Sequence, residues 1–165
     1  MERLSFCVLI LVLCSIATAL LEEQLVTFDR EQTAGALEFS NAPILRDASD
    51  PVGVQIATDS LAADLEEVTS INPTVIEWSG SGNGSDGAHR MAIIAATVDS
   101  PLALRLENQG NISIDGIRGK WETFKTALVQ APLPGIDNAL VIVGSDKRGT
   151  MYGVFTLSEQ IGKSP

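Results

Sequence analysis

A single stretch near the C-terminus, residues 139–162, most strongly restricts how this chain can fold. Residues 139–143 are apolar and largely β-branched, a composition typical of a strand buried on both faces. A polar turn follows, and from Gly149 apolar residues recur at the spacings of an amphipathic helix. These apolar residues are Met151, Val154, Leu157 and Ile161. Gly162 stands where helices commonly end, so the stretch predicts a strand, a turn and a helix.

The turn between this strand and helix carries one acid and two cations, Asp146, Lys147 and Arg148. Loops at the carboxyl ends of strands are common ligand sites in α/β folds. The backbone amides of Gly149 and Thr150 are candidates to hold an anion there, such as a uronate carboxylate, because they lie at the positive end of a helix. Lys147 and Arg148 add charge, so the three turn residues are candidate substrate-binding residues. The structural alternative is that Asp146 caps the helix while Arg148 pairs with an acid at the interface with a further domain.

The rest of the chain alternates predicted strands with predicted helices. Further strands are expected at residues 25–28, 36–39, 74–78, 91–98, 112–114 (an edge strand) and 121–129. Residues 43–45 are expected to lead into an exposed turn, and residues 79–88 to form a Gly/Ser-rich loop. The sequence shows no internal repeat. Strands interleaved with helices predict an α/β fold, a single sheet with helices packed on it.

Two proline-containing pairs mark the other helix starts. Asp50 is expected to be an N-cap with Pro51 as the first helical residue, and Ser100-Pro101 opens a shorter helix. The first helix presents one apolar face, and Asn72-Pro73 is expected to end it. That face consists of Val54, Ala57, Leu61, Leu65 and Val68.

The first residues of the chain have the composition of a secretory signal peptide. Arg3 supplies the positive region, an apolar run follows, and Ala17-Thr18-Ala19 is a small-x-small cleavage site. A transmembrane anchor is the alternative, but the apolar run is short for a bilayer. We therefore expect residues 1–19 to be removed, leaving residues 20–165 as one domain without a membrane anchor. Both cysteines lie in the leader, so an ordinary apolar core must stabilise the mature domain.

Two N-glycosylation sequons, at Asn83 and Asn111, agree with passage through a secretory pathway. Together with the leader they predict an extracellular protein with surface loops at these positions. The formal net charge is −10, and the acidic residues are concentrated in the first half of the chain. Such a surface favours solubility and repels nucleic-acid phosphates, so nucleic acid is not an expected partner.

Two features resemble cofactor or metal sites and lack the context for either. Residues 82–87 match G-x-G-x-x-G, but a strand follows instead of the helix that a dinucleotide requires. His89 is the only histidine, without cysteines or an acidic cluster beside it. We expect neither a metal nor an organic cofactor.

No pair of carboxylates is identified as a catalytic acid and base. Glycoside hydrolysis needs two carboxyl groups facing one bond, whereas the adjacent pairs Glu22-Glu23 and Glu66-Glu67 point in different directions on a strand or helix. No catalytic residue is therefore predicted in this chain.

Two motifs carry a resemblance to a known family. The segments GSDKRGTMYG and LSEQIG, within residues 144–162, follow GIRGKWETFKTALVQAPLPG at residues 116–135. In this order they resemble the end of the N-terminal domain of the xylan α-1,2-glucuronidases of glycoside hydrolase family 115. The similarity extends more weakly back to about Leu25. The resemblance implies an accessory α/β domain of the kind that precedes a catalytic (β/α)₈ barrel.

The resemblance also implies a function for the intact enzyme. Enzymes of that family remove glucuronic or 4-O-methylglucuronic acid branches from xylan with inversion, and their catalytic acids lie on the barrel. The present sequence would then be a fragment without a complete active site, acting on xylan or glucurono-xylooligosaccharides only through the barrel. Two alternatives stay open. One is a free-standing carbohydrate-binding module, although Trp78, Trp121 and Tyr152 occupy mostly core-like positions in the pattern. The other is a non-functional fragment of a broken gene model.

Overall fold

The sheet at the centre of the protein has five strands in the order β2-β1-β3-β5-β4. The computed structural model describes Val26, residues 38–80 and residues 88–162. The predicted leader, most of the two N-terminal strands and the Gly-rich loop with Asn83 lie outside these residues. The elements are β1 (Ile44–Asp47), α2 (Val52–Thr69), β2 (Val75–Trp78), β3 (Ala92–Thr97), α3 (Pro101–Asn108), β4 (Phe124–Leu133), β5 (Ile136–Gly144) and α4 (Lys147–Gln160).

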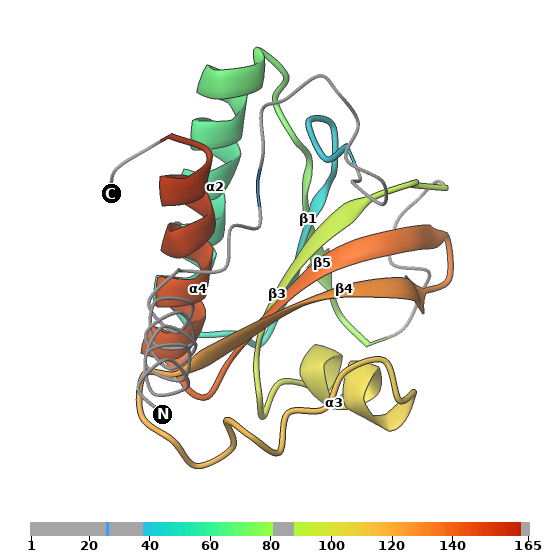
Figure 1. Cartoon of the computed structure of the whole chain (residues 1–165), viewed down its shortest axis with the longest axis vertical. Helices are drawn as coiled ribbons and strands as arrows, with labels where there is room; N and C mark the ends of the chain where they lie inside the picture. Colours follow the sequence, from blue (N-terminus) through green and yellow to red (C-terminus); the bar gives the residue numbers. More distant parts are fainter. Residues whose placement is uncertain (1–25, 27–37, 81–87, 163–165) are drawn as a thin grey trace, which may run out of the picture.

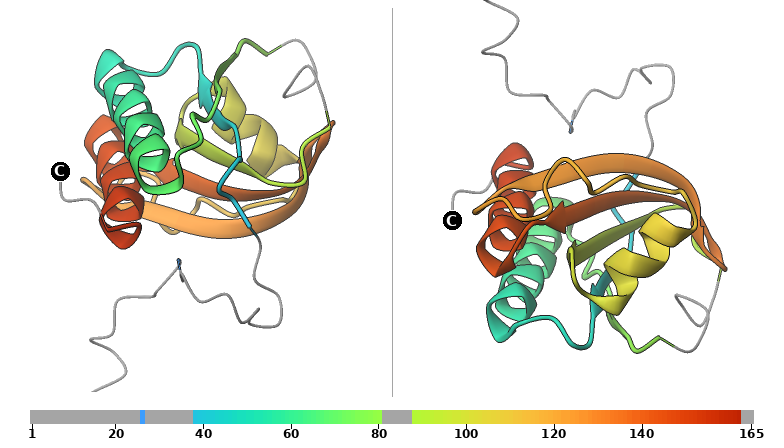
Figure 2. Two further views of the ribbon diagram at one scale, coloured as in Figure 1. Left: turned by 90° about the horizontal axis from the view of Figure 1, so that it is seen from above. Right: turned by 90° about the horizontal axis from the view of Figure 1, so that it is seen from below.

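Four neighbouring strands of the sheet are parallel, and β4 pairs antiparallel with β5 at one edge. The helices α2 and α4 lie side by side on one face, and α3 covers the other face (Figure 1). The views from above and from below show the same three layers (Figure 2). The predicted α/β fold, one sheet with helices packed on it, is therefore confirmed.

Each central strand is apolar on both faces because both faces are covered. In β1, Ile44 packs towards α2 and α4, whereas Leu45 packs towards α3. The strands β3 and β5 alternate in the same way, as Ile93 and Ile94 illustrate. This explains why residues 139–143 form a continuous apolar run.

Residues 43–45 do lead to an exposed turn, at residues 48 and 49, but the strand that precedes this turn was not predicted. Ile44 and Leu45 belong to β1 and are fully buried next to the centre of the sheet. The strand has only four residues, and its last two side chains, Arg46 and Asp47, are polar. This short and half-polar run gave too weak a pattern to predict a strand. Both polar side chains are buried and bonded within the protein.

The predicted edge strand at residues 112–114 is wrong. Ile112 and Ile114 are buried in the core on the α3 side, but the segment is irregular and pairs with no strand. Alternating apolar residues can therefore arise in a loop that folds against a sheet. Glu38 and Phe39, the described part of the strand expected at 36–39, are likewise irregular.

The predicted start of the long helix needs correction. Pro51 is the N-cap of α2, and its side chain has no oxygen that could accept a hydrogen bond from the free N–H groups of the helix. Asp50 turns instead towards β3, where its Oδ1 accepts the backbone N–H of Thr97 at 3.3 Å. The helix ends at Thr69, before Asn72-Pro73, because Ser70 adopts a left-handed conformation with φ of 59°. The predicted apolar face is buried except at its last residue, Val68.

Candidate functional site

The turn with Asp146, Lys147 and Arg148 lies where β5 leaves the sheet. Gly144 ends β5 and pairs with Phe124, the first residue of β4. Because these two strands are antiparallel, the residues just before β4 are brought to the same edge. Trp121 and Glu122 therefore meet the turn, although neither was predicted to belong to the site. The antiparallel hairpin is the sequence signal that points to them, once its turn at Pro134-Gly135 is recognised.

Three hydrogen bonds extend the pairing beyond the ends of the strands. The N–H of Ser145 donates to the carbonyl of Thr123 at 2.8 Å, and the N–H of Thr123 donates to Ser145 Oγ at 3.1 Å. The N–H of Glu122 donates to Asp146 Oδ2 at 3.0 Å. The loop before β4 and the turn before α4 are thus held as one unit.

Asp146 has the geometry of a helix cap. Its backbone is extended and its Oδ1 accepts the N–H of Gly149 at 2.8 Å. The amide of Glu122 is the main cause that lowers the pKa of the Asp146 carboxyl below its ordinary value, and the amide of Gly149 adds to it. A carboxylate held ionised in this way is a poor proton donor, so Asp146 is suited to structure and not to acid catalysis.

The amides expected to bind an anion are already occupied. The N–H of Gly149 donates to the Asp146 side chain, and the N–H of Thr150 donates to the Asp146 carbonyl at 3.0 Å. Gly149 also approaches the loop closely, because an added Cβ would lie 2.3 Å from the carbonyl oxygen of Thr123. The start of α4 therefore packs directly on the loop and leaves no space for an anion at these amides.

The two cations of the turn differ in their partners. Arg148 donates through Nη1 to Glu122 Oε1 at 2.6 Å, and this contact raises the pKa of the Arg148 guanidinium above its ordinary value. Lys147 is exposed and forms neither a hydrogen bond nor an ion pair within the described part of the chain. The acid that pairs with Arg148 therefore belongs to this domain, which corrects the expectation of an acid at the interface with a further domain.

Trp121 overturns the expectation that the tryptophans occupy core-like positions. Trp78 is buried, but 85% of Trp121 is exposed. The indole borders a shallow hollow of about 340 Å³. This hollow, called the Trp121 hollow below, is lined by Trp121, Glu122, Asp146, Lys147 and Arg148. It therefore combines all three predicted site residues with two residues from the preceding loop.

Two buried aspartates lie at the neighbouring strand ends. The chain leaves β1 for α2 on one face and leaves β3 for α3 on the other, so β1 and β3 form the topological switch point of the sheet. Buried carboxylates usually form hydrogen bonds, and Asp47 does so by accepting the N–H of Leu102 at 2.7 Å. Asp50 is only 4% exposed, and its Oδ2 has no hydrogen-bond partner among the residues that the structure describes. Burial raises the pKa of Asp50 to about 6.

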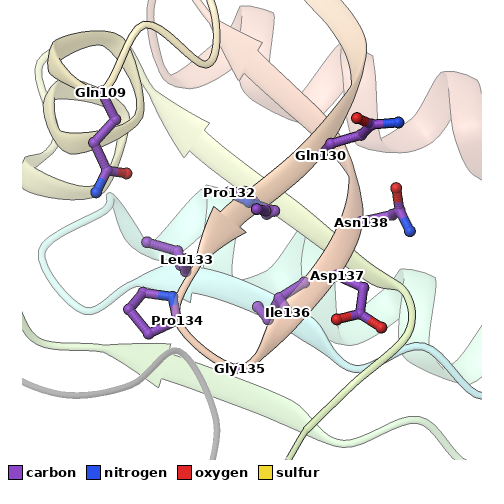
Figure 3. A pocket seen from close by; sticks show the side chains of 10 residues that line it. Gln109, Gln130, Pro132, Leu133, Pro134, Gly135, Ile136, Asp137 and Asn138 are labelled. Carbon is purple, nitrogen blue, oxygen red and sulfur yellow. The ribbon is translucent and has the colours of Figure 1, made fainter.

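A second hollow, of about 680 Å³, lies at the β4–β5 hairpin. Figure 3 shows side chains of the hairpin together with Gln109 at the end of α3. His89 lies beside this hairpin at the edge of its loop, where its N–H donates to the carbonyl of Gly135 at 2.7 Å. None of the predicted binding residues of the turn lines this hollow.

The described residues were also compared with the requirements of a metal site and of a membrane-spanning helix. They contain no group of three or more His, Cys, Asp or Glu side chains placed to hold a metal ion. None of their helices combines the length and the apolar composition that crossing a bilayer requires.

Comparison with known proteins finds similarity among solved structures. No protein-family model matches the chain, and a search of curated proteins found no significant match. A solved structure described as a "family GH115 4-O-Methyl-alpha-glucuronidase", "with specificity for decorated arabinogalactans", aligns with a TM-score of 0.54 and 28% sequence identity. The alignment covers 75% of this chain and 14% of that chain. The protein therefore shares the fold of a small part of a GH115 glucuronidase.

Proposed function

We propose that this chain is the N-terminal accessory domain of a longer, secreted glycoside hydrolase that removes glucuronic or 4-O-methylglucuronic acid from a polysaccharide. The observation that carries the proposal is the alignment itself. Sequence identity of 28% accompanies a similar fold over three quarters of this chain, yet that region is only 14% of the glucuronidase. The motif at residues 116–135 forms the loop before β4, β4 itself and the turn that follows it, and the motif at residues 144–162 forms the end of β5, the next turn and α4, which supports descent from one domain.

The geometry supports an accessory role better than a catalytic one. Asp146 and Glu122, the acids of the Trp121 hollow, are held by backbone amides and by Arg148. Asp47 and Asp50 are buried and cannot face a glycosidic bond in solvent. In this proposal the acid and base lie on a following (β/α)₈ barrel, which acts on substituted xylan or arabinogalactan.

An exposed apolar surface is available for packing against such a barrel. Val52 and Ile56, one turn apart at the start of α2, are 67% and 58% exposed. The starts of α2 and α4 touch, since an added Cβ on Gly53 would lie 3.0 Å from Met151 Sδ. Tyr152 is also exposed on α4. Exposed apolar groups of this kind commonly mark an interface.

The most direct test of this proposal is the sequence of the transcript beyond the codon for Pro165. We expect an open reading frame that encodes a (β/α)₈ barrel. A stop codon with no barrel sequence after it would contradict the accessory role. In parallel, the 165-residue protein should be assayed for release of glucuronic acid from aldouronic acids and from substituted arabinogalactan. We expect no release, and hydrolysis by this chain alone would place an active site within it.

A free-standing carbohydrate-binding module is the second candidate function, and Trp121 favours it. An 85% exposed indole beside a hollow is the aromatic surface that such a module needs. Retention of the chain on immobilised xylan, without hydrolysis and without a downstream barrel, is the result that this candidate predicts.

A further inference from the structure

Lys147 is the cation of the Trp121 hollow whose charge the fold does not use. Its side chain is exposed, and none of the described residues forms an ion pair with it. Its neighbour Asp146 directs one carboxylate oxygen to the amide of Glu122 and the other to the amide of Gly149. The positive charge of Lys147 is therefore available to a ligand.

Arg148 is positioned by a contact that leaves most of its donors unused. Nη1 alone contacts Glu122, and Nη2 and Nε make no hydrogen bond within the described chain. Glu122 thereby fixes the guanidinium group at the rim of the hollow. A carboxylate can accept two parallel hydrogen bonds from the free edge of such a group.

Trp121 supplies the apolar part of the same hollow. Burial of the exposed indole face against a ligand would remove apolar area from water, which favours binding. The hollow is shallow, and its volume of about 340 Å³ is near the lower end of the range for small-molecule sites. A ligand of this size that uses all three side chains needs an apolar ring face and a carboxylate.

We propose that the Trp121 hollow binds a hexuronate residue, with its ring against Trp121 and its carboxylate between Lys147 and Arg148. The choice of a uronic acid among carboxylate-bearing rings rests on the proposed function. A neutral sugar would leave the free ammonium group without a partner, and a simple carboxylate would leave the indole exposed. The site holds the substrate or product chain and takes no part in bond cleavage.

The test is titration of the full, folded chain with sodium D-glucuronate at low ionic strength, followed by NMR. The chain has two tryptophans, so the indole N–H signal of exposed Trp121 reports on the hollow and that of buried Trp78 serves as an internal reference. We expect saturable shifts of the Trp121 signal. D-glucose tests the ring without the carboxylate, and acetate tests the carboxylate without the ring; both should bind at least about tenfold more weakly, the equivalent of one charged hydrogen bond.

Substitutions of exposed residues test the site without disturbing the core. Lys147→Gln and Trp121→Ala should each weaken glucuronate binding by about tenfold, measured by calorimetry. Arg90→Gln removes an exposed charge outside the hollow, and Leu128→Ala removes an exposed apolar side chain from β4. Both control variants should bind as the unchanged protein does.

Three results would overturn the inference. Glucuronate binding no stronger than acetate binding would reduce the hollow to a simple anion site. Equal binding of glucose and glucuronate would show a neutral-sugar site. A folded chain that shows no saturable binding would exclude the site altogether. None of these results affects the downstream reading frame, so the accessory role and the uronate site can fail separately.

Discussion

The carboxylate of Asp146 accepts the backbone N–H of Glu122 at 3.0 Å, which joins the loop before β4 to the start of α4. The other oxygen of the same carboxylate caps α4 through Gly149. One side chain therefore determines both the start of a helix and the position of the loop that carries Trp121. This relationship makes the geometry of the Trp121 hollow depend on a residue that need not touch a ligand.

Replacing Asp146 with alanine should lower the stability of the protein by about 1 kcal/mol, the usual cost of a lost N-cap. Glucuronate binding should weaken as well, because the loop loses one of its three hydrogen bonds to the turn before α4. Asp146→Asn retains one acceptor oxygen and should have a smaller effect on both. Thermal unfolding at pH 7 and calorimetric titration measure the two effects. Unchanged stability in Asp146→Ala would mean that water replaces the cap without cost.

The stability contributed by Asp146 should disappear in acid. The pKa of its carboxyl is lower in the folded state than its ordinary value of 3.8, so the ionised form stabilises the fold. This contribution is present above pH 4 and is lost as the pH falls through the lowered pKa. Urea unfolding between pH 2 and pH 5, compared with Asp146→Asn, measures it; the variant should show a flatter dependence on pH.

Asp50 should make the stability of the protein depend on pH in the opposite direction, and in a higher pH range. Burial is the main cause that raises its pKa from 3.8 to about 6 in the folded state, and the nearby Asp47 adds to the increase. The fold therefore favours the neutral acid, and ionisation of Asp50 destabilises the protein as the pH rises from 4 through 6.

Asp50→Asn removes this ionisable group at nearly the same size. We expect the variant to gain stability relative to the unchanged protein at pH 7 and to lose that advantage near pH 4, measured by urea unfolding at both pH values. A variant that is less stable at both values would show that the hydrogen bond to Thr97 matters more than the charge.

Gly149→Ala should destabilise the protein by about 1–3 kcal/mol, the usual cost of overpacking. The new Cβ would lie 2.3 Å from the backbone oxygen of Thr123, so the helix and the loop would have to separate. Gly116→Ala is the matched control, because no atom lies within 4 Å of its added Cβ. Thermal unfolding should show little change or a small gain for the control. Equal stability of the two variants would contradict the close packing at Gly149.

The substitution Arg46→Leu should lower the free energy of unfolding by about 1–3 kcal/mol, because the charged hydrogen bonds of the guanidinium are lost. The buried guanidinium of Arg46 joins three elements, donating to Asp59 Oδ1 on α2 at 2.7 Å and to Glu77 Oε1 on β2 at 3.0 Å. Arg118→Leu removes a more exposed ion-pairing arginine and should cost less than about 1 kcal/mol. Chemical denaturation of both variants and of the unchanged protein measures the two losses of stability. A larger loss for Arg118→Leu would contradict the role given to Arg46.

Local sequence patterns were sufficient to predict much of the fold. The strand, turn and helix of residues 139–162 were predictable because a strand covered on both faces is apolar throughout and a covering helix repeats its apolar residues every three or four positions. The start of α3 was predictable for a local reason too, since Ser100 caps the helix through Ala103. The start of α2 was not, because Asp50 bonds to β3, a partner distant in sequence.

The sequence by itself identified the helices and most of the strands, although not β1, and it placed a capped helix with two cations after β5. The tertiary structure alone decided what those cations meet. Glu122 precedes Arg148 by 26 positions, and no local pattern relates them. Only the antiparallel return of β4 along β5 brings the loop to the turn, exposes Trp121 there and satisfies Arg148, because side-chain contacts between distant segments follow from strand pairing and packing.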